Sequence, residues 1–544
     1  MRLELDRRTM LQAGALALGG TALAACSSGG GGSAGGGGGG ASGAPATLPT
    51  FRLWEGPAPD FAGAADGGMD GFRAFPAEPA RAIDDVPGDG EPITFMTNIP
   101  GAIPPTREAN SFWRAVEERI GSPLDISMSS NDEYEDKFAT RVAGDDLPDL
   151  INVPPNVPQL PALLAAKALD LTEHLAGDAV LDYPFLANLP TESWKGCLQG
   201  GGIYGVPVPR GLARTSLPIY RRDLVEAAGI SDPQPTSFEE FLDLCREMTD
   251  PARNTWAWAS VPTNYLRQMW SCPYLWAVDD DGRFTAMWEL EECEAALADA
   301  VTMFEAGVVN PDAFTANVGA QKQWFAAGTA VFVLDSYVAW NQFYTDNPTL
   351  TEMRVDMLDV PGRDGGAGTP WLGLANNNIT AFNANTEHDV ETLLAVANWM
   401  AAPFGTDEYK FRKFGVEGEH HELQGTDPVV TPLGTTELGI GLQYIADAPM
   451  TLYLPGRPEV PEAQFASQQA VLDRLVADAS WGLYSETSSR VNKQIQDTIN
   501  DVTNQIIQGN AAISTWPDAV QAWLDGGGEQ IRGELEEAYA EQNG

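Results

Sequence analysis

The sequence predicts an α/β protein built from two lobes, and three observations lead to this prediction. The chain has 544 residues, more than a single hydrophobic core usually accommodates. From Pro92 onward, apolar runs of strand length alternate with amphipathic runs of helix length, which is typical of a parallel sheet covered by helices. A Gly-rich turn then leads into Val206-Pro207-Val208-Pro209. Because alternating prolines forbid a helix, we expect an extended crossing into a second lobe here.

The composition is that of an acidic, globular chain. Hydrophobic residues make up 43% of the sequence, and the formal net charge is −44. A surface of this charge repels phosphate groups, so we expect neither nucleic-acid binding nor peripheral docking on anionic lipid. We interpret the excess of carboxylates as a source of solubility for an exported protein rather than as a cation site.

Residues 1–26 are predicted to be a signal peptide that ends in a lipobox. The Ala/Leu/Gly run at 13–25 is shorter than the roughly 18 apolar residues of a membrane-spanning helix, as in signal sequences. Leu23-Ala24-Ala25-Cys26 resembles a bacterial lipobox, which implies lipid attachment at Cys26. Arg7-Arg8 fits twin-arginine export, but Asp6 and Gln12 depart from that pattern, so the general secretion route stays open.

Two segments without regular structure are predicted to follow. Residues 27–46 are almost entirely Gly, Ser and Ala, which cannot bury enough apolar surface to fold and therefore predict a flexible tether. Residues 47–90 are rich in Pro, Gly and Asp, with scattered aromatic residues. We expect these to form an irregular extension that lies over the folded body and carries no chemistry of its own.

Residues 91–210 are predicted to form the first part of lobe 1. Strands are expected at 93–98, 124–128 and 147–153, and helices at 112–120, 134–142 and 158–168. Ligands of parallel sheets bind beyond the carboxyl ends of the strands. Asn98, which ends the first strand, and Asn110, which ends the loop after it, are therefore candidate ligand-binding residues.

Residues 211–370 are assigned mostly to lobe 2, and residues 371–544 are expected to return and complete both lobes. In lobe 2, Thr236-Ser237-Phe238-Glu239 predicts the capped start of a helix, and residues 255–276 an aromatic-rich loop. A helix is expected at 290–307, a strand at 355–360, a return crossing at 371–381, and helices at 389–400 and 406–414. An apolar stripe predicts a further helix near the C-terminus, made of Val491, Ile495, Ile499, Val502 and Ile506.

Three short segments match the residue patterns of known sites, but their neighbouring residues do not fit those sites. Gly200-x-Gly202-x-x-Gly205 has the spacing of a dinucleotide site, but the prolines that follow prevent the helix that such a site needs. Adjacent histidines cannot share one face of a helix as zinc ligands do, so residues 417–422 are interpreted as a surface hairpin. Residues 279–282 are interpreted as a turn, because Ala277 and Trp288 stand where a calcium loop needs carboxylates. We predict no metal site and no cofactor.

Four cysteines remain besides Cys26, namely Cys197, Cys245, Cys272 and Cys293. Export would permit disulfides, with three pairings open if all four take part. Cys245 shares a helix face with Phe238, Phe241 and Leu242, so a buried free thiol is equally open. Their spacing does not suggest zinc ligands.

Several segments resemble the extracellular solute-binding proteins of bacterial ABC sugar importers, in particular large, lipid-anchored members similar to family 1. The segments are IYGVP at 203–207, YRRDLVEAAGI at 220–230, PTSFEEF at 235–241, GDDLPDLINV at 144–153, FAAGTAVFVLDSY at 325–337, FGVEGEHHEL at 414–423 and IIQGNAAISTWPDAVQAWLDGGGEQIRGELEEAY at 506–539. Their order and spacing extend the resemblance over most of the chain from about residue 47. The resemblance implies a two-lobed, periplasmic-binding-protein-like clamshell with crossing hinge strands and a ligand between the lobes.

A sugar ligand directs attention to aromatic and planar polar side chains. Pyranose rings pack their C–H faces on Trp and Tyr, and their hydroxyls pair with amides, carboxylates and guanidiniums. The candidates in loops or beside the expected crossings are Trp270, Trp340 and Trp371, with Arg210, Asp335 and Asn377 as polar partners. For any one of these tryptophans, a place in the hydrophobic core is an equally good interpretation.

The resemblance implies a binding protein without catalytic residues, which holds a carbohydrate, most naturally an oligosaccharide, and delivers it to a membrane permease. We expect a monomer on the extracellular face of the cell membrane, attached through its lipid alone. One alternative is a secreted glycoside hydrolase, which needs two positioned carboxyl groups, although no motif in the sequence marks such a pair. A peptide-binding relative is a second alternative.

Overall fold

The computed structural model of the chain describes residues 46–63, 67–154 and 157–543. These residues belong to one compact unit, Ala44–Gly544. The predicted signal peptide, the predicted lipid-attachment residue Cys26 and all of the predicted tether except its last residue lie outside the described residues. Within the described part, none of the helices is both long enough and apolar enough to cross a membrane.

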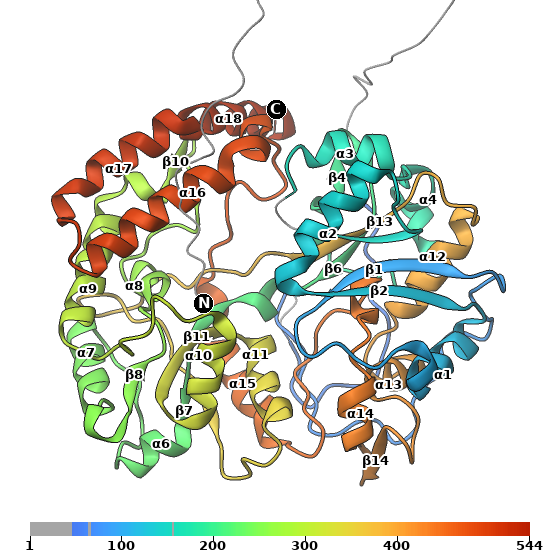
Figure 1. Cartoon of the computed structure of the whole chain (residues 1–544), viewed down its shortest axis with the longest axis horizontal. Coiled ribbons are helices and arrows are strands. Elements are labelled where there is room, and N and C mark those ends of the chain that lie inside the picture. The colour runs from blue at the N-terminus through green and yellow to red at the C-terminus, as the bar shows by residue number, and fades with distance from the viewer. Residues whose placement is uncertain (1–45, 64–66, 155–156, 544) are drawn as a thin grey trace, which may run out of the picture. The chain divides into compact units, whose positions relative to one another are not determined.

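Lobe 1 is built on a five-stranded sheet in the order β2-β1-β3-β13-β6 (Figure 1). Its strands are β1 (Ile93–Ile99), β2 (Leu124–Ser130), β3 (Leu150–Val153), β6 (Val206–Pro209) and β13 (Asn376–Phe382). The first three run parallel, as the sequence predicts, and β13 runs antiparallel to β3 and to β6. Its helices are α1 (Ser111–Ile120), α2 (Asn131–Gly144), α3 (Leu160–Lys167), α4 (Thr172–Leu175), α5 (Thr191–Lys195), α12 (Val390–Met400), α13 (Asp407–Phe414) and α14 (Pro432–Glu437).

Helix α1 shows how local sequence sets these elements. Asn110 caps the helix by accepting a hydrogen bond from the backbone N–H of Trp113, and Gly121 ends it in the left-handed region, with φ 77°. The face with Phe112 and Ile120 is fully buried in the lobe 1 core. The predicted helix and its apolar face are thus confirmed.

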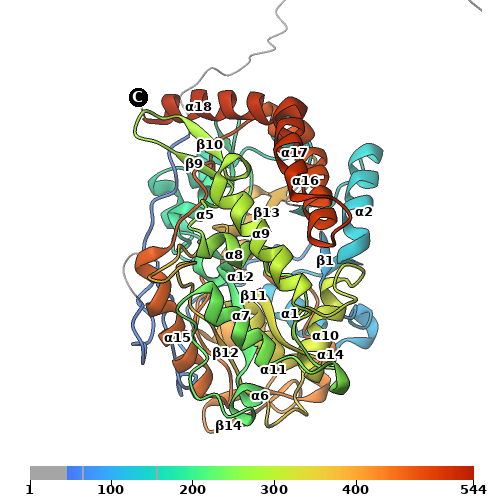
Figure 2. The same ribbon diagram turned by 90° about the vertical axis from the view of Figure 1, so that its left-hand side faces the viewer.

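Lobe 2 is built on a four-stranded sheet in the order β12-β7-β11-β8. Its strands are β7 (Ser216–Arg221), β8 (Trp256–Trp258), β11 (Ala330–Ser336) and β12 (Val355–Met357). Its helices are α6 (Arg222–Ala227), α7 (Phe238–Glu247), α8 (Thr263–Met269), α9 (Glu291–Glu305), α10 (Val318–Ala327), α11 (Tyr337–Asp346), α15 (Glu459–Val471), α16 (Glu486–Ile507), α17 (Trp516–Trp523) and α18 (Glu529–Asn543). Figure 2 faces this lobe and shows α16, α17 and α18 together at one end of it.

The structure differs from the sequence prediction in two places of lobe 2. The predicted loop at 255–276 is wrong, because it contains β8 and α8. Helix α8 buries polar as well as apolar residues, Arg267 and Gln268 included, so it lacks the amphipathic periodicity that marks a helix in sequence. The strand predicted at 355–360 ends at Met357, because Asp359 turns to hydrogen bonds with the side chains of Gln234 and Arg474.

Three two-stranded hairpins complete the regular structure. They pair β4 (Leu198–Gln199) with β5 (Gly202–Ile203), β9 (Trp276–Val278) with β10 (Phe284–Ala286), and β14 (His421–Gln424) with β15 (Asp427–Val430). The turn predicted at 279–282 is confirmed between β9 and β10. Residues 418–420 form a turn, and His421 begins β14. The surface position predicted for the histidine pair is wrong, because both side chains are buried, His420 beside Glu437 and His421 against the backbone oxygen of Phe414. In the described residues there is no group of three or more His, Cys, Asp or Glu side chains that could hold a metal ion.

The two lobes have separate hydrophobic cores, and beyond residue 92 the chain passes between them three times. The first passage leaves β6 in lobe 1 and enters lobe 2 at Leu212. The second runs from Trp371, in the lobe 2 core, into β13. The third runs from Ala446, in the lobe 1 core, to Leu452, in the lobe 2 core. We call residues 210–215, 371–375 and 447–451 the crossing segments.

Residues 46–91 contain no named helix or strand where they are described, and they contact both lobes. Trp54 packs against the lobe 1 core and Met69 is buried in the lobe 2 core. Phe72 and Phe75 form a third small cluster with Phe404 and Tyr453. The extension thus spans the two lobes in addition to the crossing segments.

All four cysteines in the described part are buried free thiols. The Sγ of Cys245 accepts a hydrogen bond of 3.2 Å from the indole N–H of Trp258. Burial raises the pKa of Cys245 to about 12 and that of Cys197 well above its usual value. These two thiols are therefore unreactive at neutral pH.

The buried apolar stripe of α16 is expected to contribute measurably to the stability of the protein. Ile495, Ile499 and Ile506 are buried in the lobe 2 core, as expected. We expect Ile499→Ala to lower the free energy of unfolding by about 2–4 kcal/mol, because it removes a buried side chain and leaves a cavity. Denaturant titration measures the change. The matched control is Asn500→Ala, whose side chain is exposed on the same helix; an equal loss in both variants would show that the stripe does not pack as described.

Candidate functional site

Amide side chains line the carboxyl edge of the lobe 1 sheet. Asn98 near the end of β1, Asn152 in β3 and Asn131 at the start of α2 form a chain, in which each Nδ2 to Oδ1 hydrogen bond is 2.7 Å long. Tyr444, which precedes the third crossing segment, lies within hydrogen-bond reach of Asn98. The edge therefore presents fixed donors and acceptors of the kind that pair with hydroxyl groups.

Strand β13 adds three further asparagines to this edge, because it runs antiparallel and its first residues lie where the parallel strands end. Arg214 of the first crossing segment donates to the side-chain oxygen of Asn377 at 3.0 Å, and Asn377 donates to that of Asn378 at 3.1 Å. The side-chain nitrogen of Asn378 is buried and has no hydrogen-bond partner. The ladder with β6 is irregular between Asn376 and Ile379. This bulge is a common feature of strands beside binding sites.

A pocket of about 280 Å³ lies along this edge. Its lining comes from lobe 1, from the second crossing segment with β13, and from a loop of lobe 2. The lining residues are Val153, Pro154, Leu160, Lys195, Gly196, Leu198 and Gln199 from lobe 1, Leu374 and Asn376 to Ile379, and Asp478 with Ser480 to Tyr484 from lobe 2. This volume is close to the lower end of the range of small-molecule sites.

Two aromatic side chains of the lobe 2 loop lie in this pocket. Tyr484 is 48% exposed, and Trp481 donates from its indole N–H to the backbone oxygen of Glu192 in lobe 1 at 3.1 Å. An aromatic ring with one face free offers the surface on which a pyranose packs. The sequence analysis missed both residues. Their signal is the run Trp481-Gly482-Leu483-Tyr484 directly before the capped start of α16, which places two aromatics in an irregular loop.

Asp478 supplies the only carboxylate among the residues that line this pocket. Burial raises its pKa to about 6, although the backbone N–H and the hydroxyl of Ser480 donate to it at 3.0 and 2.9 Å. The side chain is therefore mostly ionised at neutral pH and gains a proton in mildly acidic solution.

The structure places three of the predicted site residues at or beside this edge. Asn98 belongs to the amide chain and Asn377 lines the pocket. Arg210 begins the first crossing segment, where its backbone N–H donates to Ala375 at 2.8 Å and its side chain pairs with Asp447 at 3.4 Å. The sheet topology brings these residues together although they are more than a hundred residues apart in sequence.

Two other predicted residues lie at the matching edge of lobe 2. Asp335 is at the end of β11, where it forms an ion pair of 3.1 Å with Lys322. Trp371 is stacked on Tyr274 with ring centroids 5.0 Å apart, and its indole N–H donates to the backbone oxygen of Cys272. Trp371 is itself buried, so Tyr274 is the more exposed ring of this pair.

The remaining three predicted residues have structural partners. Asn110 is the fully buried cap of α1, and Trp340 is fully buried in the lobe 2 core. Neither offers a surface to a ligand in this structure. Trp270 donates from its indole N–H to Asp299 at 2.8 Å and packs beside Arg363.

A serine, a histidine and a glutamate meet between α1 and α14. Ser111 Oγ lies 3.1 Å from His420 Nε2, which is 3.2 Å from Glu437 Oε2. A nucleophilic triad uses one ring nitrogen for the serine and the other for the acid. Here Nδ1 of His420 accepts the backbone N–H of Val416, so Ser111 and Glu437 share Nε2. Since the hydroxyl of Ser111 donates to Glu437 directly, the group acts as a structural network.

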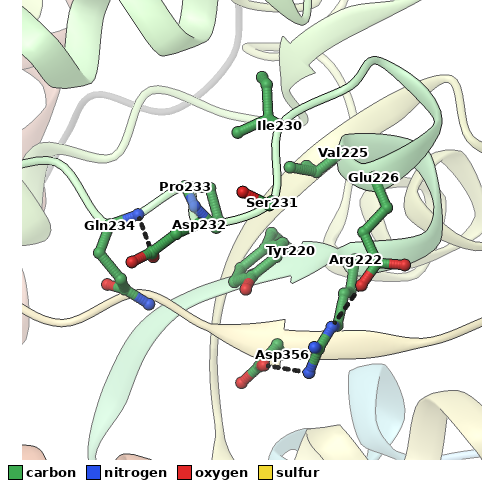
Figure 3. A pocket seen from close by; sticks show the side chains of 10 residues that line it. All are labelled: Tyr220, Arg222, Val225, Glu226, Ile230, Ser231, Asp232, Pro233, Gln234 and Asp356. Carbon is green, nitrogen blue, oxygen red and sulfur yellow. Dashed lines mark hydrogen bonds and ion pairs between the residues drawn. The ribbon is translucent and has the colours of Figure 1, made fainter.

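A second pocket, of about 160 Å³, lies at the far end of β7 in lobe 2 (Figure 3). Arg222 there pairs with Glu226 at 2.8 Å and with Asp356 at 3.2 Å. Burial raises the pKa of Asp356. Strand β7 leads away from the first crossing segment, so this pocket is at the opposite end of the lobe 2 sheet from the crossing edge. Arg222, Glu226 and Asp356 are thus paired with one another, and Asp232 accepts a hydrogen bond from the backbone N–H of Gln234.

A comparison with known protein families gives a match over more than half of the chain. The model of the bacterial extracellular solute-binding protein family matches residues 123–405. Two curated relatives come from Bacillus subtilis (strain 168). The polygalacturonan/rhamnogalacturonan-binding protein YtcQ is 22% identical over 454 residues, which are 78% of this chain and 87% of the relative. The lipoprotein LipO is 21% identical over 480 residues, which are 83% of this chain and 93% of the relative.

Solved structures show the same fold. The substrate-binding protein FusA of an ABC transporter of S. pneumoniae, in complex with kestose, has a TM-score of 0.60 at 12% identity and covers 83% of this chain and 99% of its own. At this identity the likeness concerns the fold alone. It confirms the predicted fold class, a two-lobed α/β protein similar to periplasmic binding proteins.

The raised pKa of Asp478 predicts a pH-dependent effect of its removal. The folded state holds a proton more tightly than the unfolded state, so wild-type stability declines as the pH rises from about 4 to about 6. Asp478→Asn removes this decline while its side-chain oxygen can still accept from Ser480. We compare the free energy of unfolding of the variant with that of wild type at each pH. The variant should gain on wild type between pH 4 and pH 7.5, by at most about 3 kcal/mol. Denaturant titrations at both pH values measure it; a difference that does not change with pH would contradict the assignment.

Proposed function

This chain belongs to the family of bacterial extracellular solute-binding proteins, and we propose that it binds an oligosaccharide in the pocket at the crossing edge. The observation that carries the proposal is one pocket of about 280 Å³ that combines the asparagines of β13, 376–378, with the aromatic rings of Trp481 and Tyr484. Asparagine side chains pair with sugar hydroxyls, and Trp481 and Tyr484 provide faces for pyranose rings. The printed names of YtcQ and of the FusA complex, which concern a polysaccharide and an oligosaccharide, support this ligand class.

The pocket takes residues from both lobes and from the passage between them, which suits capture by closure. A ligand that touches both sides stabilises the closed arrangement, because it makes more contacts there than in an open one. The three crossing segments would then act as the hinge. The indole N–H of Trp481 already joins the lobe 2 loop to Glu192 of lobe 1, so this contact would report on closure.

We further propose delivery of the sugar to an ABC permease, by a monomer held on the extracellular face through lipid at Cys26. Membership of an extracellular family supports the location, and the lipoprotein name of LipO supports the anchor. A glycoside hydrolase is the less favoured reading, because it needs two carboxyl groups at the sugar and the pocket has Asp478 alone. No feature of the pocket favours a peptide.

Thermal unfolding of the chain from residue 47 onward, against a panel of mono- and oligosaccharides, tests the ligand class. A ligand at 100 times its dissociation constant adds about 2.7 kcal/mol to the free energy of unfolding. We expect a selective shift with one class of oligosaccharide and no product formation. A shift with peptides alone, or release of reducing sugar, would overturn the proposal.

The aromatic surface predicts the effect of one substitution. We expect Tyr484→Ala to weaken oligosaccharide binding about fivefold to tenfold, because a stacked ring contributes about 1 kcal/mol beyond its buried area. Isothermal titration calorimetry measures the change. The control is Phe51→Ala, since Phe51 is also 48% exposed but lies in the N-terminal extension. Unchanged affinity in the Tyr484 variant would place the sugar elsewhere.

A further inference from the structure

Three cationic side chains converge on one buried carboxylate where the crossing segments meet lobe 1. The carboxylate belongs to Asp447, the first residue of the third crossing segment. Nη2 of Arg412 lies 2.8 Å from Oδ1, Nζ of Lys413 lies 3.2 Å from Oδ1, and Nη1 of Arg210 lies 3.4 Å from Oδ2. Arg412 and Lys413 end α13, and Arg210 follows β6. We call these four residues the Asp447 cluster.

The Asp447 cluster holds two positive charges more than its carboxylate neutralises. At Arg363, by contrast, two carboxylates, Asp299 and Asp364, pair with one guanidinium. In the ranges that the structure describes, no other carboxylate is shared by three Lys or Arg side chains. The imbalance stands out in a chain whose formal net charge is −44.

Burial makes this imbalance energetically important. The side chain of Arg412 is 1% exposed and its Nε has no hydrogen-bond partner, while that of Arg210 is 13% exposed. Buried charge without a partner is strongly unfavourable. Burial alone would raise the pKa of Asp447, but Lys413, Arg412 and Arg210 outweigh it and hold that pKa well below its usual value. The cluster is therefore short of negative charge.

The Asp447 cluster adjoins the amide edge of lobe 1. Tyr444, three residues before Asp447, experiences the charge of Arg210 and lies within hydrogen-bond reach of Asn98. The side chain of Lys413 is 33% exposed, so the cluster is open to solvent through this ammonium, whereas Arg210 and Arg412 are 13% and 1% exposed. An anionic group of a ligand seated at the edge would meet the ammonium of Lys413, and the two largely buried guanidiniums would act on it over a longer distance.

We propose that the Asp447 cluster receives an acid group of the ligand, which makes the ligand an acidic oligosaccharide such as an oligomer of uronic acid. This inference rests on the proposed sugar-binding function. Guanidinium groups pair with carboxylates in a planar fork, and an ammonium adds a compact charge. A carboxylate at this place supplies the missing negative charge, whereas a neutral sugar leaves the imbalance unchanged.

The test compares an oligogalacturonide with the same chain after full methyl esterification, which removes the charge and keeps the ring hydroxyls. Calorimetric titration gives both affinities for wild type and for Lys413→Gln, which is chosen because its partly exposed side chain can be replaced without disturbing the core. We expect wild type to prefer the acid at least tenfold, and the variant to lose about tenfold for the acid and nothing for the ester. The matched control is Lys410→Gln on the same helix, whose ammonium pairs with Glu417.

A second readout separates the charge of Lys413 from its shape. Burial, together with Arg412 and Arg210, lowers the pKa of Lys413 to about 8, against the opposing effect of Asp447; the ring of Tyr409 lies 5.9 Å from the ammonium. As the pH rises through 8 the ammonium loses its proton, so affinity for the acid should fall between pH 7 and 9. Affinity for the ester should stay constant, and Lys413→Gln should abolish the pH dependence of acid binding.

Each outcome has a distinct meaning. Equal binding of acid and ester, unaffected by Lys413→Gln, overturns this inference and leaves the proposed function standing. Failure of every saccharide in the panel to bind overturns the proposed function itself. Stabilisation by inorganic phosphate or sulfate that needs Lys413, without any preference for the acidic sugar, assigns the cluster to a free anion and also overturns the inference.

Discussion

The antiparallel insertion of β13 into an otherwise parallel sheet is the constraint on which the site depends. Strand β6 leaves lobe 1 at its carboxyl end, and β13 enters at its amino end. Because the two strands are antiparallel neighbours, exit and return must lie at one edge, and this is the edge where β1 and β3 also end. The proposed hinge and the proposed binding surface are thereby placed together. The hydrogen bond from Arg210 N–H to Ala375 O continues the pairing into the crossing segments themselves.

This arrangement would also let the lobes close as proposed without losing their own stability. Each lobe has a separate hydrophobic core, and each core contains residues that precede and residues that follow the crossing segments in sequence. Besides the extension at 46–91, which contacts both lobes, individual polar contacts join them, such as Arg214 to Asn377, Trp481 to Glu192 and the backbone of Gln159 to Ser489 at 3.3 Å. Contacts of this kind cost little to exchange for water or ligand. Closure can therefore be decided by the small free energy that a ligand contributes.

The charge of the Asp447 cluster is opposite in sign to the net charge of the whole chain. A net charge of −44 keeps the surface acidic, whereas the Asp447 cluster concentrates positive charge beside the sheet edge. Long-range repulsion is screened within about 10 Å in salt, but buried charges are screened much less. Local electrostatics in the crossing region can therefore favour an anion that the outer surface would repel.

The sequence by itself determined the elements whose signals are local. Proline alternation predicted the crossing at β6, and periodic apolar residues predicted α1 and α16. Resemblance to a family predicted the two lobes. The site was only partly accessible in this way. Asn98 was predicted from a strand end and Asn377 from its place beside an expected crossing, whereas Trp481 and Tyr484 lie in an irregular loop whose position no periodicity reveals. The placement of Trp340 in the core and the meeting of Arg210, Arg412, Lys413 and Asp447 were decided by tertiary structure alone. These residues come from segments far apart in the chain, and only sheet order and the packing of α13 bring them within a few ångströms of one another.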